Sequence, residues 1–233
     1  MGKTITIQAS DGSGSFSGYL AEPASGKGPG ILVIQEVFGV NKVMRDICDD
    51  LARQGYVALC PDLFWRQEPG VDITDKTKEE WDKAFKLFGG FDLDKGVDDL
   101  KASLAALRQL PAVTGKVGTV GYCLGGRLAF LMACRSDVDA AVSYYGVMLA
   151  EHLGEVANIR KPLMMHVATE DKFVPKDQQQ KVKTAVSANP NVTLHEYQGK
   201  DHAFARVGGE HYDKAAADTA NQRTAEFFKK HLA

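Results

Sequence analysis

The chain has 233 residues, of which 44% are hydrophobic and 25% charged, and its formal net charge at pH 7 is -2. This composition is typical of globular proteins, and the small net charge gives no reason to expect nucleic acid or an anionic membrane as a partner. The length is ordinary for one α/β domain, so we predict a single domain over residues 1–233. The start MGKTITIQAS lacks the apolar stretch of a secretory signal, and no apolar run reaches the roughly 18 residues of a membrane span, so we expect a cytoplasmic protein.

The first half of the chain predicts strands that alternate with helices. Residues 3–10 and 15–24 flank an Asp-Gly-Ser-Gly turn, which predicts a β-hairpin. The apolar run 31–34 is typical of a strand buried on both faces of a parallel sheet. A helical pattern then begins, with Asn41 as its N-cap and Gly55 as its C-terminal stop. The remaining elements of this half are a buried strand, a long loop and two helices, expected at 56–61, 62–75, 76–88 and 93–109.

The second half continues this alternation. Further strands are predicted at 116–123, 138–146, 162–171 and 192–199, and further helices at 124–135, 176–187 and 212–231. Strands that are joined by crossover helices run parallel, so we expect an α/β fold with a mostly parallel central sheet and helices on both faces. Ligand sites of such sheets lie beyond the carboxyl ends of the strands, so the residues that follow each strand are the candidates for a site.

Three reactive side chains follow predicted strands, namely Cys123, Asp171 and His202. Their order along the chain, nucleophile then acid then histidine, is that of the catalytic triad in the α/β-hydrolase fold. In such a triad Cys123 attacks, His202 accepts and returns its proton, and Asp171 holds the imidazole in the required tautomer. No group of side chains has metal-ligand spacing, so we expect neither a metal nor another cofactor.

The stretch GYCLGG, residues 121–126, favours Cys123 as the nucleophile. It lies between a predicted strand and a predicted helix, and its glycines permit the tight turn that such a junction requires. The backbone N–H of Leu124 opens the helix and is expected to face a developing oxyanion. The other cysteines are interpreted as reduced packing residues, at Cys48, Cys60 and Cys134.

Two of these assignments have rivals in the sequence. Glu170 directly precedes Asp171, and the stretch EDKFVP favours Asp171 as the acid. Other histidines compete with His202, but His166 and His195 lie within predicted strands. Of the remaining histidines, His211 and His231 lie at the two ends of the last predicted helix, and His152 lies in a segment expected at the surface.

Glu36, within QEVFGVN, follows the first buried strand and has two interpretations. A carboxylate beside the nucleophile disfavours a thiolate by charge repulsion, but it can also accept the thiol proton and so hold an unreactive S–H form. Alternatively, Glu36 is a surface or salt-bridged glutamate that takes no part in the chemistry.

Five motifs in order resemble the dienelactone hydrolase family, namely QEVFGVN, GYCLGG, YYG, DKFVP and HAFAR. The similarity covers nearly the whole chain. It implies a single α/β-hydrolase domain and a cysteine-dependent carboxylic ester hydrolase, which opens the lactone ring of dienelactone to give maleylacetate. In the family this step belongs to the bacterial breakdown of chlorinated aromatic compounds.

The resemblance also implies roles for residues around the triad. Substrate binding displaces Glu36, which then takes the proton of Cys123, and the resulting thiolate pairs with His202. The backbone N–H groups of Val37 and Leu124 supply the oxyanion hole. The other residues expected at the substrate are one arginine and three aromatic residues, Arg206, Phe38, Tyr145 and Trp81.

Two positions depart from the family pattern. Trp81 stands where the family has a second arginine for the substrate carboxylate, and Ala203 stands where it has a serine. Losing one of two such contacts is expected to weaken anion binding tenfold or more, because a charged hydrogen bond contributes roughly 1.5–3 kcal/mol. Arg66 or Lys83 compensates for this loss only if the fold brings its side chain to the site.

The substrate is therefore open at the level of sequence. We expect a small-molecule lactone or ester as the partner of a monomeric enzyme, with dienelactone as the first candidate. The alternatives are hydrolysis of another small ester or lactone by the same triad, a non-catalytic ligand-binding protein on this scaffold, and a redox role for Cys123.

Overall fold

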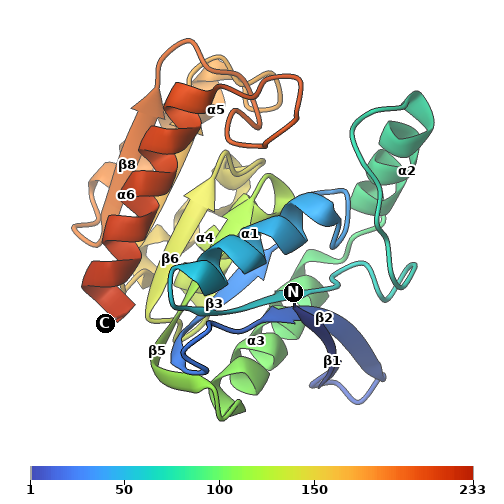
Figure 1. Ribbon diagram of the computed structural model, residues 1–233. Coiled ribbons are helices and arrows are strands. Elements are labelled where there is room, and N and C mark those ends of the chain that lie inside the picture. Colours follow the sequence, from blue (N-terminus) through green and yellow to red (C-terminus); the bar gives the residue numbers. More distant parts are fainter. Residues whose placement is uncertain (1, 233) are drawn as a thin grey trace. The chain divides into compact units, whose positions relative to one another are not determined.

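The computed structural model describes residues 2–232, which fall into two units, Met1–Val117 and Gly118–Ala233 (Figure 1). Strands and helices alternate along both units as the sequence predicts. No helix within residues 2–232 is long and apolar enough to cross a membrane. The assignment of the whole chain to a single domain stays a prediction.

The first unit contains a mixed sheet. Its strands are β1 (Lys3–Gln8), β2 (Ser15–Ala21), β3 (Gly28–Ile34) and β4 (Val57–Pro61). β1 and β2 form the predicted hairpin, with Ile7 opposite Phe16, and β2 pairs antiparallel with β4 on its other side. β4 pairs parallel with β3. Residues 31–34 of β3 are fully buried, as their unbroken apolar run predicts.

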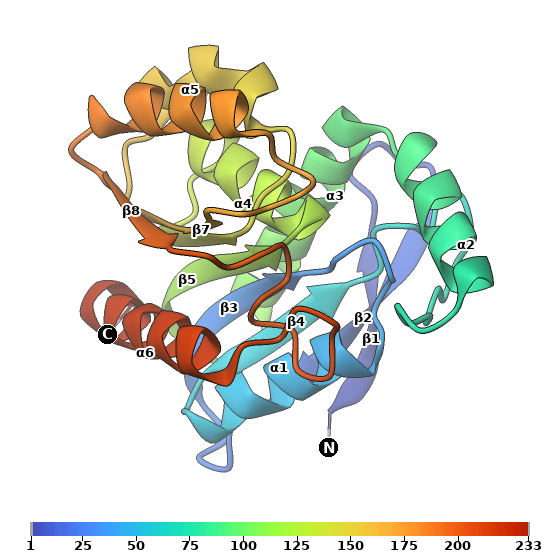
Figure 2. The same ribbon diagram turned by 90° about the horizontal axis from the view of Figure 1, so that it is seen from above.

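Helices cover both faces of this sheet. α1 (Lys42–Arg53) packs on β4 from one side and α3 (Leu93–Gln109) packs on β3 from the other (Figure 2). α1 begins where expected, since the Asn41 side chain accepts a hydrogen bond from the third residue of the helix at 3.2 Å. It ends just before Gly55, whose φ of 99° suits glycine. α2 (Lys78–Gly89) begins at a capping box formed by Thr77 and Glu80.

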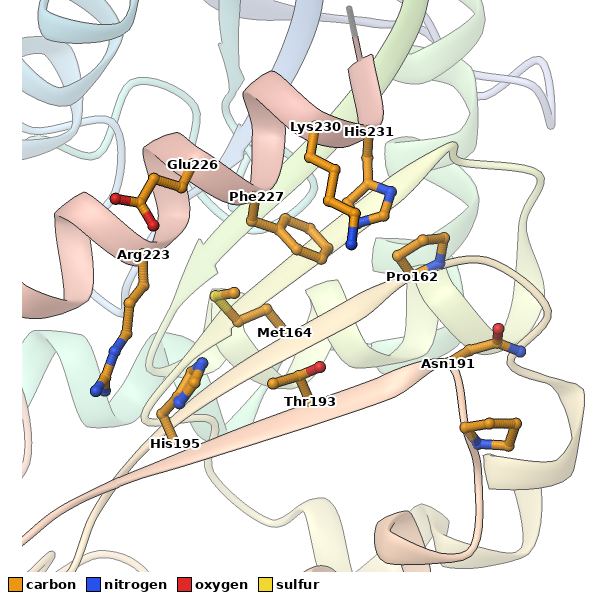
Figure 3. A pocket seen from close by; sticks show the side chains of 11 residues that line it. Pro162, Met164, Asn191, Thr193, His195, Arg223, Glu226, Phe227, Lys230 and His231 are labelled. Atoms are coloured by element: carbon orange, nitrogen blue, oxygen red, sulfur yellow. The ribbon is translucent and has the colours of Figure 1, made fainter.

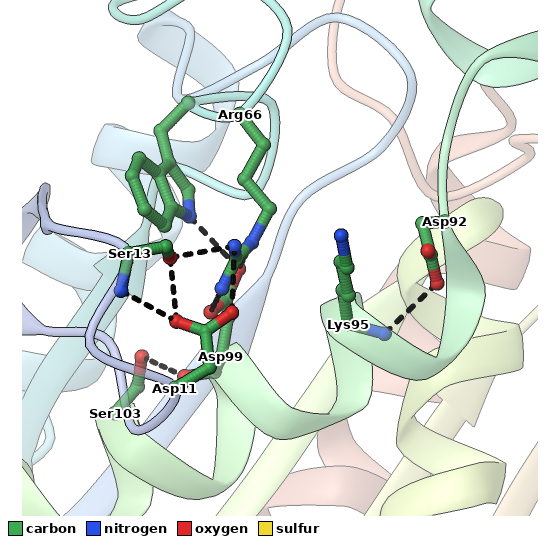
Figure 4. A network of polar contacts seen from close by, with 8 residues as sticks. Asp11, Ser13, Arg66, Asp92, Lys95, Asp99 and Ser103 are labelled. Atoms are coloured by element: carbon green, nitrogen blue, oxygen red, sulfur yellow. Dashed lines mark hydrogen bonds and ion pairs between the residues drawn. The ribbon is translucent and has the colours of Figure 1, made fainter.

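A charged network anchors the long loop that precedes α2. Arg66 donates to both carboxylate oxygens of Asp99 on α3, at 2.9 and 2.8 Å (Figure 4). The indole N–H of Trp65 donates to the same carboxylate at 2.8 Å, and Arg66 also pairs with Asp11 at 3.0 Å. Asp99 is only 1% exposed, so this bidentate pair is largely removed from water. The loop 62–75 is therefore tied both to α3 and to the turn of the β1–β2 hairpin.

The second unit contains parallel strands. They are β5 (Val113–Tyr122), which begins in the first unit, β6 (Ala140–Tyr144), β7 (Leu163–Ala168) and β8 (Val192–Tyr197). β6 pairs parallel with β5 and with β7, and β7 pairs parallel with β8. β5 begins at Val113, earlier than residue 116 as predicted.

Helices also cover both faces of the second unit's strands. α4 (Leu124–Arg135) and α5 (Lys176–Ser187) lie on one side, and α6 (Lys214–Leu232) lies on the other (Figure 2). With helices on both faces of mostly parallel strands, the predicted α/β fold class is confirmed.

One element of the second unit was not predicted. Residues 149–158 form a 3-10 helix, η1 (Leu149–Asn158), whose carboxylates pair with α4. Glu151 lies 2.6 Å from Arg127, and Glu155 lies 2.7 Å from Arg135. His152 lies in a partly exposed segment, as expected, but its own side chain is half-buried and its Nε2 atom lies 2.8 Å from the Arg127 guanidinium. Contacts that are distant in sequence hold η1, and so its local pattern did not reveal it.

Candidate active site

Cys123 occupies a tight turn between β5 and α4. Its backbone has φ 56° and ψ -115°, a conformation that costs a non-glycine residue of order 1–3 kcal/mol and persists only where its surroundings enforce it. The Cys123 N–H donates to the Tyr144 carbonyl, and the Cys123 carbonyl accepts from the Arg127 N–H, each at 3.1 Å. These bonds lock the thiol at the junction of a strand and a helix, where a nucleophile elbow requires it.

The glycines of GYCLGG are explained by close backbone approaches. A Cβ atom on Gly121 would collide with the carbonyl group of Gly125. A Cβ atom on Gly126 would collide with the backbone of Tyr144 and of Gly146, on β6 and just beyond it. Only glycine fits at either position, so the motif reflects the packing of the turn against its neighbouring strand.

His202 and Asp171 form a buried pair in the same unit. The Nδ1 atom of His202 lies 2.8 Å from Oδ2 of Asp171, and their side chains are 4% and 2% exposed. The other oxygen of Asp171, Oδ1, accepts the Phe173 N–H at 2.9 Å. The rival acid Glu170 is exposed and instead pairs with Lys176 at 2.6 Å. The fold therefore presents Asp171, and not Glu170, to the imidazole.

The second imidazole nitrogen of His202 is directed to the thiol. Its Nε2 atom is buried and has no partner of good hydrogen-bond geometry within residues 2–232. Burial by itself lowers the pKa of His202, but the negative charge of Cys123 in its thiolate form and the bond to Asp171 outweigh burial and raise this pKa to about 10. The protonated imidazole is therefore the form that the thiolate and Asp171 both stabilise.

Aromatic side chains surround the imidazole. The rings of Phe173 and Tyr145 meet the His202 ring edge-on, with centroids 4.8 and 5.1 Å away. Phe173 is 48% exposed, an unusual exposure for a phenylalanine, so it forms an apolar rim beside the histidine. Arg206 is buried, at 8% exposure, and follows His202 within the same loop.

The remaining candidates lie in the first unit, beyond β3. Glu36 is 1% exposed, so the interpretation of this residue as a surface glutamate is wrong. Val37 and Phe38 are buried as well. The Phe38 ring meets the Trp81 indole edge-on, at a centroid distance of 5.0 Å. Glu36, Val37 and Phe38 are thus buried together in the segment that follows β3, and Phe38 contacts Trp81.

Position 81 presents an aromatic surface and no cation. Trp81 stacks on Phe85 at 5.4 Å, and its indole N–H donates to the Asp75 carbonyl at 3.1 Å. The expectation that Arg66 or Lys83 replaces the missing arginine finds no support, because both are engaged within the first unit. Arg66 is bound to Asp99 as described above, and Lys83 pairs with Glu68 at 2.6 Å.

The strand histidine His166 belongs to a buried network that the sequence did not reveal. His166 Nδ1 lies 2.8 Å from the Tyr197 hydroxyl, and its Nε2 lies 3.0 Å from the Thr224 hydroxyl. Thr224 also bonds to the Tyr144 hydroxyl at 2.7 Å. Burial, with help from His195 and Arg223, holds the pKa of His166 well below its ordinary value. This network joins β6, β7 and β8 to α6 and leaves His166 without a role in the candidate site.

A separate hollow of about 510 Å³ lies between α6 and the strands β7 and β8 (Figure 3). The side chains of His195, Arg223 and Lys230 line it together with Glu226. None of the predicted site residues lines this hollow, so it is distinct from the surroundings of Cys123 and His202.

The fold and the strand–Cys–helix turn define a class of protein, the α/β-hydrolases. A solved structure of a putative dienelactone hydrolase from Klebsiella pneumoniae subsp. pneumoniae MGH 78578 matches with a TM-score of 0.86 and covers 99% of this chain and 100% of its own. Its sequence identity is 24%, so this likeness concerns the fold alone.

Sequence similarity defines the family within that class. Residues 16–232 match the model of the dienelactone hydrolase family. A putative carboxymethylenebutenolidase of Azospirillum brasilense is 57% identical over 232 residues, which is 98% of each chain. The carboxymethylenebutenolidase of Pseudomonas putida is 42% identical over 223 residues, or 96% of this chain and 94% of that one. The chain belongs to the dienelactone hydrolase family and is a carboxylic ester hydrolase.

Proposed function

We propose that this enzyme opens the lactone ring of dienelactone to give maleylacetate through a triad of Cys123, His202 and Asp171. The observation that carries the proposal is the buried bond of 2.8 Å between His202 and Asp171. The imidazole of His202 is also electrostatically coupled to the thiol of Cys123, which a strained turn holds in place. The relatives named carboxymethylenebutenolidase support the choice of substrate.

The first half of the reaction forms a thioester. The Cys123 thiolate attacks the lactone carbonyl, and the developing oxyanion accepts the Leu124 N–H, which the first turn of α4 leaves unused. The tetrahedral intermediate collapses, the C–O bond of the ring breaks, and His202 gives its proton to the departing enol oxygen.

The second half releases the product. His202, now neutral, takes a proton from water as the water oxygen attacks the thioester carbonyl. The C–S bond breaks, the carboxylic acid leaves, and the thiolate again faces a protonated His202. Throughout both halves Asp171 keeps Nδ1 protonated and stabilises the imidazolium.

Glu36 and Val37 complete the proposed site. Glu36 receives the proton of the resting thiol when substrate arrives and returns it to the Cys123 thiolate after the product leaves. The Val37 N–H is the second oxyanion donor. The burial of Glu36 supports this role, because only a carboxylate inside the fold can exchange a proton with a buried thiol. A thiolate suits an enol lactone, which has a good leaving group, better than it suits an amide.

A second candidate function is the hydrolysis of a neutral or aromatic ester. The aromatic side chains of Trp81 and Phe85 favour it, because neither of them can pair with a substrate carboxylate. Arg206 is then the sole arginine proposed for a carboxylate, and an acidic substrate is held less tightly than by two arginines.

The deciding experiment compares cis- and trans-dienelactone with p-nitrophenyl acetate. We expect kcat/KM to be larger for a dienelactone, whereas a ratio that favours the neutral ester supports the second candidate. The Cys123→Ser variant is expected to fold and to lose nearly all turnover of both substrates, because the site activates a thiol and not an alcohol. Near-normal hydrolysis by this variant refutes the thiol mechanism.

Two variants separate the roles of the substrate contacts. Arg206→Ala is expected to raise KM for dienelactone more than for p-nitrophenyl acetate, and an equal effect on both shows that Arg206 does not hold a carboxylate. Trp81→Arg is expected to lower KM for dienelactone, with Lys83→Ala as the matched control on the same helix. An unchanged KM in Trp81→Arg shows that position 81 does not contact the substrate carboxylate.

A further inference from the structure

We propose that Asp201, the residue before His202, is a positioning residue that holds the two loops of the His202–Asp171 pair in register. This inference rests on the proposed catalytic role of His202. The family resemblance assigned no role to Asp201, and no motif singled it out for itself. Its side chain is 15% exposed and lies between the loop that follows β7 and the loop that follows β8.

One carboxylate oxygen of Asp201 bonds to both loops. Oδ1 accepts the backbone N–H of His202 at 2.7 Å and the backbone N–H of Lys172 at 3.1 Å. Lys172 directly follows Asp171, so a single oxygen atom fixes the chain next to the acid and the chain at the histidine. Any shift of one loop relative to the other must break at least one of these bonds.

The second oxygen holds the carboxylate in place. Oδ2 of Asp201 pairs with the Lys172 ammonium at 2.9 Å and lies 3.6 Å from Nε2 of His211. The Lys172 ammonium compensates the charge of Asp201, so the carboxylate is stable as an anion while its other oxygen accepts two N–H groups. The side chain is thereby restrained at both oxygens.

The backbone at this place needs such restraint. Ala203, the next residue after His202, has φ 61°, which an alanine rarely adopts and which the surroundings must enforce. The neighbouring bonds between the loops are few: Glu170 N–H to the Lys200 carbonyl at 2.8 Å, and Gly199 N–H to the Thr169 hydroxyl at 2.9 Å. These bonds lie on the strand side, so Asp201 supplies a backbone link between the two loops directly beside the His202–Asp171 bond.

The consequence for the reaction is geometric. The His202–Asp171 bond must survive while the imidazole gains and loses a proton at Nε2, and a catalytic group must stay within about 0.5 Å of its productive place. Since Asp201 touches neither substrate nor imidazole, its loss is expected to act on kcat through the position of His202 and to leave substrate binding largely unchanged.

The test compares substitutions that remove different parts of this arrangement. Asp201→Ala removes both backbone bonds and is expected to lower kcat tenfold or more, with KM within threefold of the wild-type value. Asp201→Asn keeps an oxygen acceptor for the two N–H groups, and its kcat is expected within threefold of wild type. Lys172→Ala is the matched control, because it removes the ion pair and keeps the backbone N–H of residue 172.

A spectroscopic measurement makes the test independent of turnover. The Nδ1 proton of His202, bonded to Asp171, is expected as a low-field proton resonance that His202→Gln abolishes. It is expected to persist in Asp201→Asn and Lys172→Ala, and to broaden or disappear in Asp201→Ala. If Cys123→Ala retains turnover, the proposed function fails, whereas this resonance still decides the role of Asp201.

Three results overturn the positioning role. The first is Asp201→Ala with wild-type kcat and an unchanged resonance. The second is a kcat in Asp201→Asn that is as low as in a folded Asp201→Ala, because the loss of kcat then follows from the charge of Asp201 and not from its two backbone bonds. If Asp201→Ala does not fold, Asp201→Glu replaces it, since it keeps the charge and displaces the oxygens by one methylene. A lower kcat is then expected, and wild-type kcat in Asp201→Glu is the third contrary result.

Discussion

Removing the charge of Asp171 is the most direct perturbation of the candidate site. In Asp171→Asn the side chain keeps its size, but the anion that faces His202 Nδ1 becomes a neutral amide. The two side chains are 2% and 4% exposed and their atoms are 2.8 Å apart, so water cannot replace the lost partner. The imidazolium that forms during each half-reaction then lacks its counter-charge.

The magnitude follows from that burial. A buried hydrogen bond to a charged group contributes about 1.5–3 kcal/mol, and each 1.36 kcal/mol is a factor of about ten in rate, so the lost bond alone lowers kcat about 10- to 150-fold. An asparagine that turns its N–H₂ toward Nδ1 adds a further loss, because it favours the tautomer whose Nε2 already carries a proton and cannot accept one. We therefore expect at least a tenfold fall in kcat.

The assay is steady-state hydrolysis of p-nitrophenyl acetate and of dienelactone at pH 7.5, with near-UV circular dichroism to verify the fold. Glu170→Gln is the matched control, since it neutralises the adjacent carboxylate that pairs with Lys176 at the surface, and we expect its kcat within twofold of wild type. A folded Asp171→Asn enzyme with less than a twofold loss refutes the role of Asp171. A larger loss in Glu170→Gln assigns that role to the neighbouring acid.

Three further predictions concern the fold. Arg66→Ala leaves the buried carboxylate of Asp99 without its cation, with only the Trp65 N–H as a side-chain donor, and is expected to lower the free energy of unfolding in urea by about 3 kcal/mol. Lys83→Ala removes a more exposed ion pair and is expected to lower it by less than about 1 kcal/mol, and equal losses in the two variants contradict the network. Gly126→Ala places a methyl group against the backbone of β6 and is expected to cost about 1–3 kcal/mol and most of the activity, whereas Gly154→Ala, with open space around it, is expected to be harmless; a harmless Gly126→Ala contradicts the packing of the elbow. Because the pKa of His166 is well below 6.5 in the folded state, its unfolded form takes up a proton first as the pH falls, so the free energy of unfolding falls below pH 6.5 by up to about 1.4 kcal/mol per pH unit from this residue. The His166→Gln variant is expected to lose that part of the slope in urea titrations between pH 6.5 and 5, and an unchanged slope contradicts it.

The apolar and glycine patterns of the sequence were sufficient for the fold class. The run 31–34 forms a fully buried strand, Asn41 caps α1, and the turn before residue 15 closes a hairpin. These features depend on neighbouring residues in the chain, and so the sequence carries their signal locally. η1 escaped prediction because its charged side chains pair with residues of α4 that lie 20 and 24 positions away in the chain.

The sequence by itself determined the chemical types at the candidate site: one cysteine between glycines, and a later acid and histidine in the order of a triad. The stretch EDKFVP favours Asp171 over its neighbour Glu170, and the tertiary structure shows that Asp171 is the carboxylate that reaches His202. Asp171 faces His202 while Glu170 faces solvent, because alternate side chains of a turn point to opposite sides and the sequence does not state which side is inward.

The same limit applies to the charged residues around the site. Arg66 is a plausible substrate contact in the sequence, but in the fold it is bound to Asp99, thirty-three positions along the chain. Asp201 shows no pattern of its own, and its two backbone bonds exist only because β7 and β8 bring their following loops together. Residue types follow from the sequence, whereas the partner of each charge depends on contacts between distant segments, which form only when the strands pair.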